Sequence, residues 1–378
     1  MSAEPTPPPA QPPETEKVST LELYFDLVFV FIVTQVTHMV EHAHGPLDVM
    51  KGMLVLGITW WMYGGYAWLT NHVSTSHPAH RLWILLGMAG FLMIGVSVPH
   101  VFTEGGMLFG VGFMLVVLVH TVLFTRADSK APIMASLRMA PYHLLAAVLA
   151  LGAGFTSGQM DWILLGGAFS IQFLSPLLTR TRGFRVQPRH FVERHGLVMI
   201  IALGEAVVAI GTTTTEEPLV MPLIMKALMG LVLTSALWWS YFAGESQAAE
   251  RALEHAQTQN RSKMALAGYG YAHLGMIVGI VLLASSIQGF MVHPSEQEGF
   301  PPEWLLAWGL CVYLLSDVFF RIWLSIGLQT FRLGFALLMP VLGWVASHLP
   351  EMVQLSTFTL ALVLMVVLEQ VRTSRLPR

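Results

Sequence analysis

Residues 50–63 read Met-Lys-Gly-Met-Leu-Val-Leu-Gly-Ile-Thr-Trp-Trp-Met-Tyr, and residues 225–241 read Met-Lys-Ala-Leu-Met-Gly-Leu-Val-Leu-Thr-Ser-Ala-Leu-Trp-Trp-Ser-Tyr. Each segment opens an apolar stretch with a lysine, Lys51 or Lys226, and soon reaches a Trp-Trp-x-Tyr tetrad. About twelve apolar stretches of spanning length follow one another along the chain. The sequence therefore predicts an all-α membrane protein.

The composition agrees with that fold class. The chain has 378 residues, of which 54% are hydrophobic and only 11% are charged, with a mean hydropathy of +0.62. A soluble domain carries about 25% charged residues, because water must wet its surface. The net charge of −3 carries little information, since the arrangement of charge matters more than its sum in a membrane protein.

A helix needs roughly 20 largely apolar residues to cross about 30 Å of hydrocarbon. We expect spans near residues 21–41, 47–69, 81–101, 106–125, 133–153, 159–179, 190–212, 219–243, 264–290, 303–326, 329–348 and 353–371.

Basic residues orient these spans. When the loops are numbered in turn, 18 of the 20 Lys and Arg residues fall on one side, and Lys51 and Lys226 are the exceptions. The opposite loops carry acids instead: Glu104, Glu216, Glu217, Glu296, Glu298, Glu303 and Glu351. Cytoplasmic loops of membrane proteins are rich in Lys and Arg, so both termini are expected in the cytoplasm.

The two tetrads indicate an internal duplication. Trp60, Trp61 and Tyr63 recur 178 residues later as Trp238, Trp239 and Tyr241, Lys51 recurs as Lys226, and residues 27–35 align with residues 197–205 at an offset of 170. Six spans separate the copies, so the repeats would be parallel. The alternative is that aromatic pairs near span ends are interfacial anchors. The predicted organisation is a disordered Pro-rich tail (1–20), a first six-helix repeat (21–180), a basic linker (181–189), a second repeat (190–371) and a basic tail (372–378).

Two acids lie within the expected spans. Asp26 is five residues into the first span, and Glu205 lies about 18 Å beyond Glu193 at 1.5 Å per residue, near the middle of the bilayer. An ionised acid there costs about 2.5–3.5 kcal/mol, so such residues usually face an interior cavity. The alternatives are a protonated Glu205 that packs two helices together, and an Asp26 that caps a helix or pairs with a basic loop residue. Candidate residues of a polar pathway are Glu22, Asp26, Thr34, Gln35, His38, Glu193, Arg194 and Glu205.

Other motifs favour structural roles. Residues 38–42 (His-Met-Val-Glu-His) fit a metal-binding pattern through His38 and His42, but a polar helix end is the preferred interpretation, and no cofactor is expected. Asp317 and Arg321 are spaced to pair within one helix. The glycine pairs Gly106/Gly110 and Gly275/Gly279 favour close helix packing. The lone Cys311 excludes an intrachain disulfide, and no nucleotide or nucleic-acid signature is present.

Two segments resemble signatures of the low temperature requirement A (LtrA) family of bacterial membrane proteins. Residues 21–31 (Leu-Glu-Leu-Tyr-Phe-Asp-Leu-Val-Phe-Val-Phe) resemble the first signature, and residues 193–197 (Glu-Arg-His-Gly-Leu) with 200–205 (Ile-Ile-Ala-Leu-Gly-Glu) resemble the second. The resemblance runs from about residue 20 to 290; Tyr24 and His195 depart mildly, standing where aromatic residues, often Phe, are typical. It implies a multi-pass protein of the bacterial inner membrane that is linked to growth in the cold, and it implies no particular activity.

The segment Tyr24-Phe25-Asp26, followed by Val28, Phe29 and Thr34, is also similar to the Phe-Ser-Asp helix of lysosomal and bacterial potassium/proton channels. Those channels share six-span repeats and cytoplasmic termini. Phe25 replaces their serine, and Thr20 replaces their arginine six residues before the aspartate, which weakens the likeness.

Three classes of function remain open from the sequence. The first is transport of an ion, proton or small solute between the two halves, past Asp26 and Glu205. The second is a non-transporting, lipid-binding or membrane-organising protein linked to growth at low temperature, and the third is an intramembrane enzyme, which is the least favoured. Membrane lipids and a small ion or solute are the expected partners, and a homo-oligomer is allowed.

Overall fold

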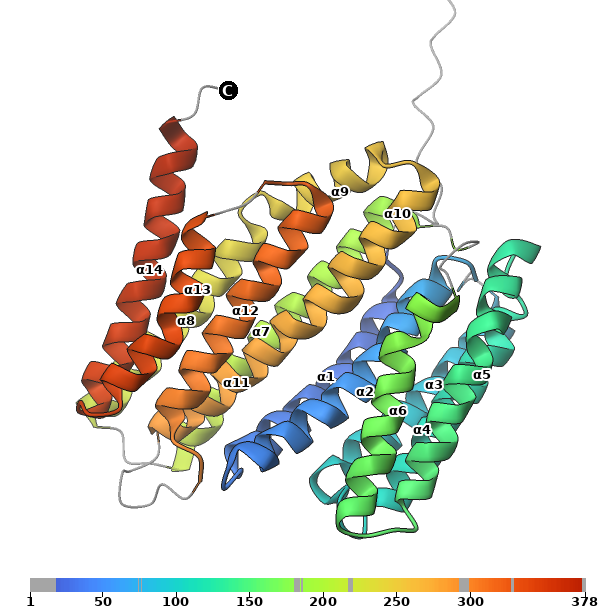
Figure 1. The fold of residues 1–378 in the computed structure, drawn as a ribbon, viewed down its shortest axis with the longest axis horizontal. Helices are drawn as coiled ribbons and strands as arrows, with labels where there is room; N and C mark the ends of the chain where they lie inside the picture. The colour runs from blue at the N-terminus through green and yellow to red at the C-terminus, as the bar shows by residue number, and fades with distance from the viewer. Residues whose placement is uncertain are drawn as a thin grey trace, which may run out of the picture.

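The computed structural model describes residues 18–73, 75, 77–179, 184, 186–216, 220–291, 299–327 and 330–375, and it is helical throughout (Figure 1). No strand occurs among these residues. The predicted Pro-rich tail falls almost wholly on residues outside the described ranges, as do residues 181–183 and 185 of the predicted basic linker. Pro188 and Arg189, the last two residues of that linker, already belong to helix α7 (Pro188–Glu216).

The first half of the chain forms six long helices. They are α1 (Thr20–Glu41), α2 (Pro46–Thr70), α3 (Pro78–Ser97) with the short 3₁₀ turn η2 (Val98–His100), α4 (Gly106–Phe124), α5 (Lys130–Ala153) and α6 (Gln159–Thr179). Ser19 and Glu22 start α1 with a reciprocal cap, in which Ser19 Oγ accepts from Glu22 N and Glu22 Oε2 accepts from Ser19 N. Such a cap satisfies two backbone donors that would otherwise lack partners.

The second half adds two short helices. Its elements are α7 (Pro188–Glu216), α8 (Met221–Phe242), α9 (Glu245–His255), α10 (Thr258–Ala265), the π-helical turn η3 (Leu266–Ala272), α11 (His273–Met291), α12 (Pro302–Leu324), α13 (Thr330–Ala346) and α14 (Glu351–Arg375). The short helices α9 and α10 lie at the same end of the bundle as the last turn of α14 (Figure 1).

Ten of the described helices are long and apolar enough to cross a membrane: α1, α3, α4, α5, α6, α7, α8, α11, α12 and α14. The chain is therefore a multi-pass membrane protein, while the number of twelve crossings stays a prediction. The helix α13 has only 17 residues. The helix α2 is long, but its Gly, Thr, Trp and Tyr residues lower its hydropathy. It packs against α1, α4, α6 and α11, and an enclosed helix has less need of an apolar surface than one that faces lipid.

The centre of the bundle is formed by α1, α2, α7 and α11, with α3–α6 on one side and α8, α13 and α14 on the other (Figure 1). The two halves have matching neighbours. The helix α1 packs against α2 and α3, as α7 packs against α8 and α11, and α2 packs against α6, as α8 packs against α14. A parallel duplication predicts these pairings, and the duplication itself stays a prediction.

Close helix contact at glycine holds α11 against α12. A Cβ on Gly279 would lie 2.6 Å from the carbonyl oxygen of Gly309, and a Cβ on Gly309 would lie 2.9 Å from the carbonyl oxygen of Gly279. Small residues let helix backbones approach in this way inside membranes, as the sequence predicted for Gly275 and Gly279.

We expect Gly279→Ala to lower the free energy of unfolding by about 1–3 kcal/mol, because the added methyl group must force two backbones apart. Thermal unfolding of the purified protein in detergent measures this change. The control is Gly166→Ala on α6, where no atom lies within 4 Å of the added Cβ. Equal melting temperatures for the two variants would show that the α11–α12 contact is not close-packed.

Candidate functional site

A buried ion network joins the first turns of α1 and α7 to the last turns of α2. Its centre is Arg194 on α7, whose side chain is only 1% exposed. Glu22 and Asp26 are one turn apart on α1, so both carboxylates face α7. The guanidinium therefore lies between two acids from the other half of the chain.

Arg194 binds α1 and α2 at once. Its Nη1 lies 3.1 Å from Glu22 Oε1 and 2.5 Å from the hydroxyl oxygen of Thr70, and its Nη2 lies 3.4 Å from Asp26 Oδ1. The guanidinium carbon is 5.5 Å from the ring centre of Phe25 and 5.7 Å from that of Tyr63. Aromatic faces attract a cation, and more strongly where water is excluded.

Tyr63 and His190 complete the network. The Tyr63 hydroxyl donates to Asp26 Oδ1 at 2.9 Å, and His190 Nε2 lies 3.2 Å from Glu22 Oε1. Three polar atoms still have no hydrogen-bond partner among the described residues: Asp26 Oδ2, Arg194 Nε and His190 Nδ1. The network thus holds two carboxylates, one guanidinium and one imidazole.

A second polar contact joins the same two helices further along. The Thr34 hydroxyl on α1 lies 2.6 Å from Glu205 Oε2 on α7, and Glu205 is buried. Arg194 and Glu205 are eleven residues apart, or about 16 Å along the helix. The two contacts are therefore separate polar sites on one helix–helix interface.

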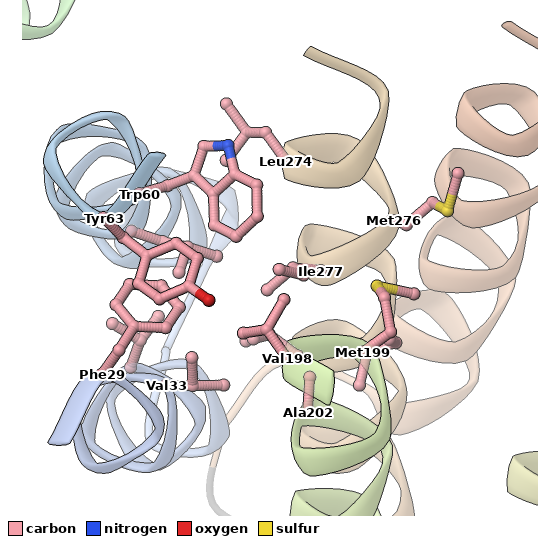
Figure 2. Close-up of a cluster of buried hydrophobic side chains, with 14 of the residues drawn as sticks. Phe29, Val33, Trp60, Tyr63, Val198, Met199, Ala202, Leu274, Met276 and Ile277 are labelled. Carbon is pink, nitrogen blue, oxygen red and sulfur yellow. The ribbon is translucent and has the colours of Figure 1, made fainter. Parts of the chain in front are cut away.

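Apolar side chains fill the space between the Arg194 network and the Thr34–Glu205 contact. Phe29 and Val33 on α1 meet Val198 and Ala202 on α7, and Ile277 on α11 closes the cluster (Figure 2). All five side chains are fully buried. These five side chains offer no polar group between Asp26 and Glu205.

Beyond Glu205, the C-terminal end of α1 opens on a cavity of about 530 Å³. It is lined by His38, Met39, His42, His44, Asp48, Lys51, Pro99, Phe102 and Thr103. His38 Nδ1 pairs with Glu41 Oε2 at 3.2 Å, and His42 Nδ1 bonds the His38 carbonyl oxygen. No group of three His, Cys, Asp or Glu residues placed to hold a metal occurs in the described ranges, so the His38/His42 pair lacks a third such ligand there.

The structure brings six of the eight candidate pathway residues to the α1–α7 interface and the C-terminal end of α1. These are Glu22, Asp26, Thr34, His38, Arg194 and Glu205. Glu193 is exposed, and Gln35 is half-buried outside these hydrogen bonds. Asp26 pairs with an arginine of another helix rather than with a loop residue. Sequence reasoning missed Thr70 and His190. For Thr70 the signal was Arg194, because a buried guanidinium needs several acceptors; His190 pairs with Glu22, and no sequence signal pointed to it.

The repeat-matched residues lie in different surroundings. Trp60 and Trp61 are buried, whereas Trp238 and Trp239 are 44% and 46% exposed. Tyr63 and Tyr241 are both buried, and the Tyr241 hydroxyl meets His273 Nε2 at 2.8 Å. Lys51 pairs with Asp48 on its own helix, while Lys226 binds Glu351 of α14 and the Phe290 carbonyl at 2.6 Å each. Lys226 therefore joins α8 to α11 and α14.

A second ion cluster joins α9, α12, α13 and α14. Arg332 binds both oxygens of Glu369, at 2.7 and 3.0 Å, and also pairs with Asp317 and Glu245. Arg321 pairs with Glu245 and, as predicted, with Asp317 on its own helix. A cavity of about 320 Å³ reaches Glu245, Arg321, Arg332 and Glu369. Water in this cavity can hydrate the cluster, whereas the Arg194 network is sealed.

Arg194→Leu should destabilise the protein by about 3–5 kcal/mol, because it leaves two buried carboxylates without a counter-charge. Thermal unfolding in detergent measures the loss. Arg189→Leu, on the same helix but exposed, is the matched control and should stay within about 0.5 kcal/mol of the parent. Similar losses in both variants would contradict a stabilising role for the network.

Comparison with known proteins places the chain in a described group. The model of the bacterial low temperature requirement A protein (LtrA) matches residues 17–367. An uncharacterized protein of Rhizobium meliloti (strain 1021) is 24% identical over 294 residues, which cover 74% of this chain and 71% of the relative.

Proposed function

The chain belongs to the bacterial low temperature requirement A family, and we propose that it conducts protons or small monovalent cations across the membrane along the α1–α7 interface. The observation that carries the proposal is the buried oxygen Asp26 Oδ2, which has no hydrogen-bond partner among the described residues. It belongs to one of the two buried carboxylates that share the Arg194 guanidinium. A proton or a monovalent cation at this oxygen completes the site.

The cost of burial supports this interpretation. A charged side chain within a bilayer costs about 2.5–3.5 kcal/mol, and residues that bear this cost usually line ion or proton pathways. Asp26, whose Oδ2 has no hydrogen-bond partner among the described residues, is the group that a passing cation would meet.

The arrangement along the interface supports it as well. Polar groups occur at Glu22 and Asp26, then at Thr34 and Glu205, and then at the cavity beside His38. The fully buried cluster around Phe29 and Val198 separates the first two of these polar sites (Figure 2). Transport therefore requires that α1 and α7 move apart at this cluster, which makes the described conformation an occluded one.

Flux through proteoliposomes tests the proposal. Protein reconstituted in vesicles with an internal pH-sensitive dye should dissipate an imposed pH or potassium gradient. Asp26→Asn and Glu205→Gln should each lower the initial rate at least tenfold, since each removes a cation-binding carboxylate. Glu254→Gln, an exposed acid on α9, is the control and should match the parent.

Stability separates loss of function from loss of fold. Asp26→Asn leaves Glu22 and Arg194 as a balanced pair, so its melting temperature should equal or exceed that of the parent. A parent protein without flux of protons, Na⁺ or K⁺, or variants with unchanged flux, would leave the network as packing within a non-transporting membrane protein.

A further inference from the structure

A second set of buried polar groups lies outside the α1–α7 interface, around a cavity of about 70 Å³ between α2, α4, α5, α6 and η3. The cavity is lined by Trp60, Trp61, Gly64, Gly65, Trp68, His120, Phe124, Ser136, Met139, His143, Pro176, Phe184, Leu266 and Gly270. Aromatic and aliphatic side chains dominate this wall. His120 and His143 are therefore its chemically distinctive members.

Both imidazoles are buried with incomplete hydrogen bonding. His120 on α4 and His143 on α5 are 4% and 5% exposed. Both ring nitrogens of His120 and the Nε2 of His143 lack a hydrogen bond of good geometry, and the backbone of Gly65 is the polar neighbour of the His120 ring. A buried polar group without a partner costs free energy. Two such groups facing one cavity indicate that a ligand completes them.

The spacing of the rings suits a shared metal ion. Their centroids lie 5.9 Å apart. Two metal–nitrogen bonds of about 2 Å each, with the ring radii added, place imidazole centroids about 6 Å apart across one ion. Met139 precedes His143 by four residues on α5, so its thioether lies on the same helical face and on the same cavity wall.

The size of the cavity argues against an organic ligand. An apolar cavity of about 150 Å³ is known to hold benzene, and sites for drug-sized molecules measure about 300–1,000 Å³. At about 70 Å³, this space accommodates an ion with its ligands or a few waters.

The chemistry of the wall selects the ion. The wall contains no acid and no cysteine, so its ligands are neutral. The cost of burying a charge rises with its square, which favours a monovalent ion over a divalent one. A thioether favours a soft metal such as Cu(I), and imidazole also binds copper. Trp68 and Phe124 on the same wall add aromatic faces, which attract cations.

We propose that His120, His143 and Met139 form a buried binding site for a soft monovalent metal ion with the chemistry of Cu(I). The site is independent of the α1–α7 interface, because it shares none of the polar groups at Arg194 or Glu205.

Metal titration of the full-length protein tests the site. Protein in detergent, purified with a tag that contains no histidine, is titrated with Ag⁺, a redox-silent probe, and with Cu(I) buffered by a chromogenic chelator. The parent should retain one equivalent of metal after desalting, and Ag⁺ should raise its melting temperature. His120→Asn and His143→Gln should each abolish retention, and Met139→Leu should weaken Cu(I) binding at least tenfold.

Two further substitutions keep the test independent of folding defects at the histidines. A side chain at Gly64 would project into open space at the cavity wall, so Gly64→Leu should block binding while both imidazoles remain. Gly166→Leu on α6, also in open space but away from the cavity, should bind as the parent does. Cys311→Ala and His42→Gln should also retain one equivalent, since they remove the lone thiol and one imidazole outside the proposed site.

A parent that retains no metal overturns the proposal. So does retention that persists in the His120 and His143 variants, or that disappears in Cys311→Ala or His42→Gln.

Discussion

The pairing of Arg194 with Glu22 and Asp26 is the interaction on which the centre of this protein depends. A guanidinium inside a bilayer-spanning bundle must find counter-charge within the protein, because lipid supplies none. Here the acids come from α1 and a further acceptor, Thr70, comes from α2. One side chain of the second half thus holds two helices of the first half in place. The aromatic rings of Phe25 and Tyr63, which lie beside the guanidinium, belong to the same arrangement.

Hydropathy was enough to predict most of the helices, while the orientation inferred from basic residues stays a prediction. Most expected spans coincide with a helix to within a few residues; α1, for example, was expected at 21–41 and runs from Thr20 to Glu41. The span expected at 264–290 is divided among α10, η3 and α11. Such patterns work because the bilayer imposes one length and one polarity on every crossing helix. The helix α2 shows the limit of this reasoning. Its Trp60, Tyr63 and Tyr66 are buried among other helices, so its composition reports protein contacts rather than lipid.

The site was predictable in part. Acids within apolar helices, such as Asp26 and Glu205, stand out in any sequence because of their cost. Their partners were not predictable, since Tyr63, Thr70 and His190 are ordinary residues until the packing of α1, α2 and α7 is known. The Trp-Trp-x-Tyr tetrads illustrate the same point. The two tetrads lie in different environments, because Trp60 is buried whereas Trp238 is 44% exposed.

The two oxygens of Glu22 serve two different structures. Oε1 accepts from Arg194, while Oε2 accepts from the backbone nitrogen of Ser19 and so begins α1. Because one carboxylate does both, the first turn of α1 and the ion network are thermodynamically linked, and such linkage is reciprocal. Any event that withdraws charge from Glu22 also loosens the end of a helix that faces the solvent. The rate at which backbone amides at the start of α1 exchange their protons with water therefore reports on the charge of the buried Glu22 carboxylate.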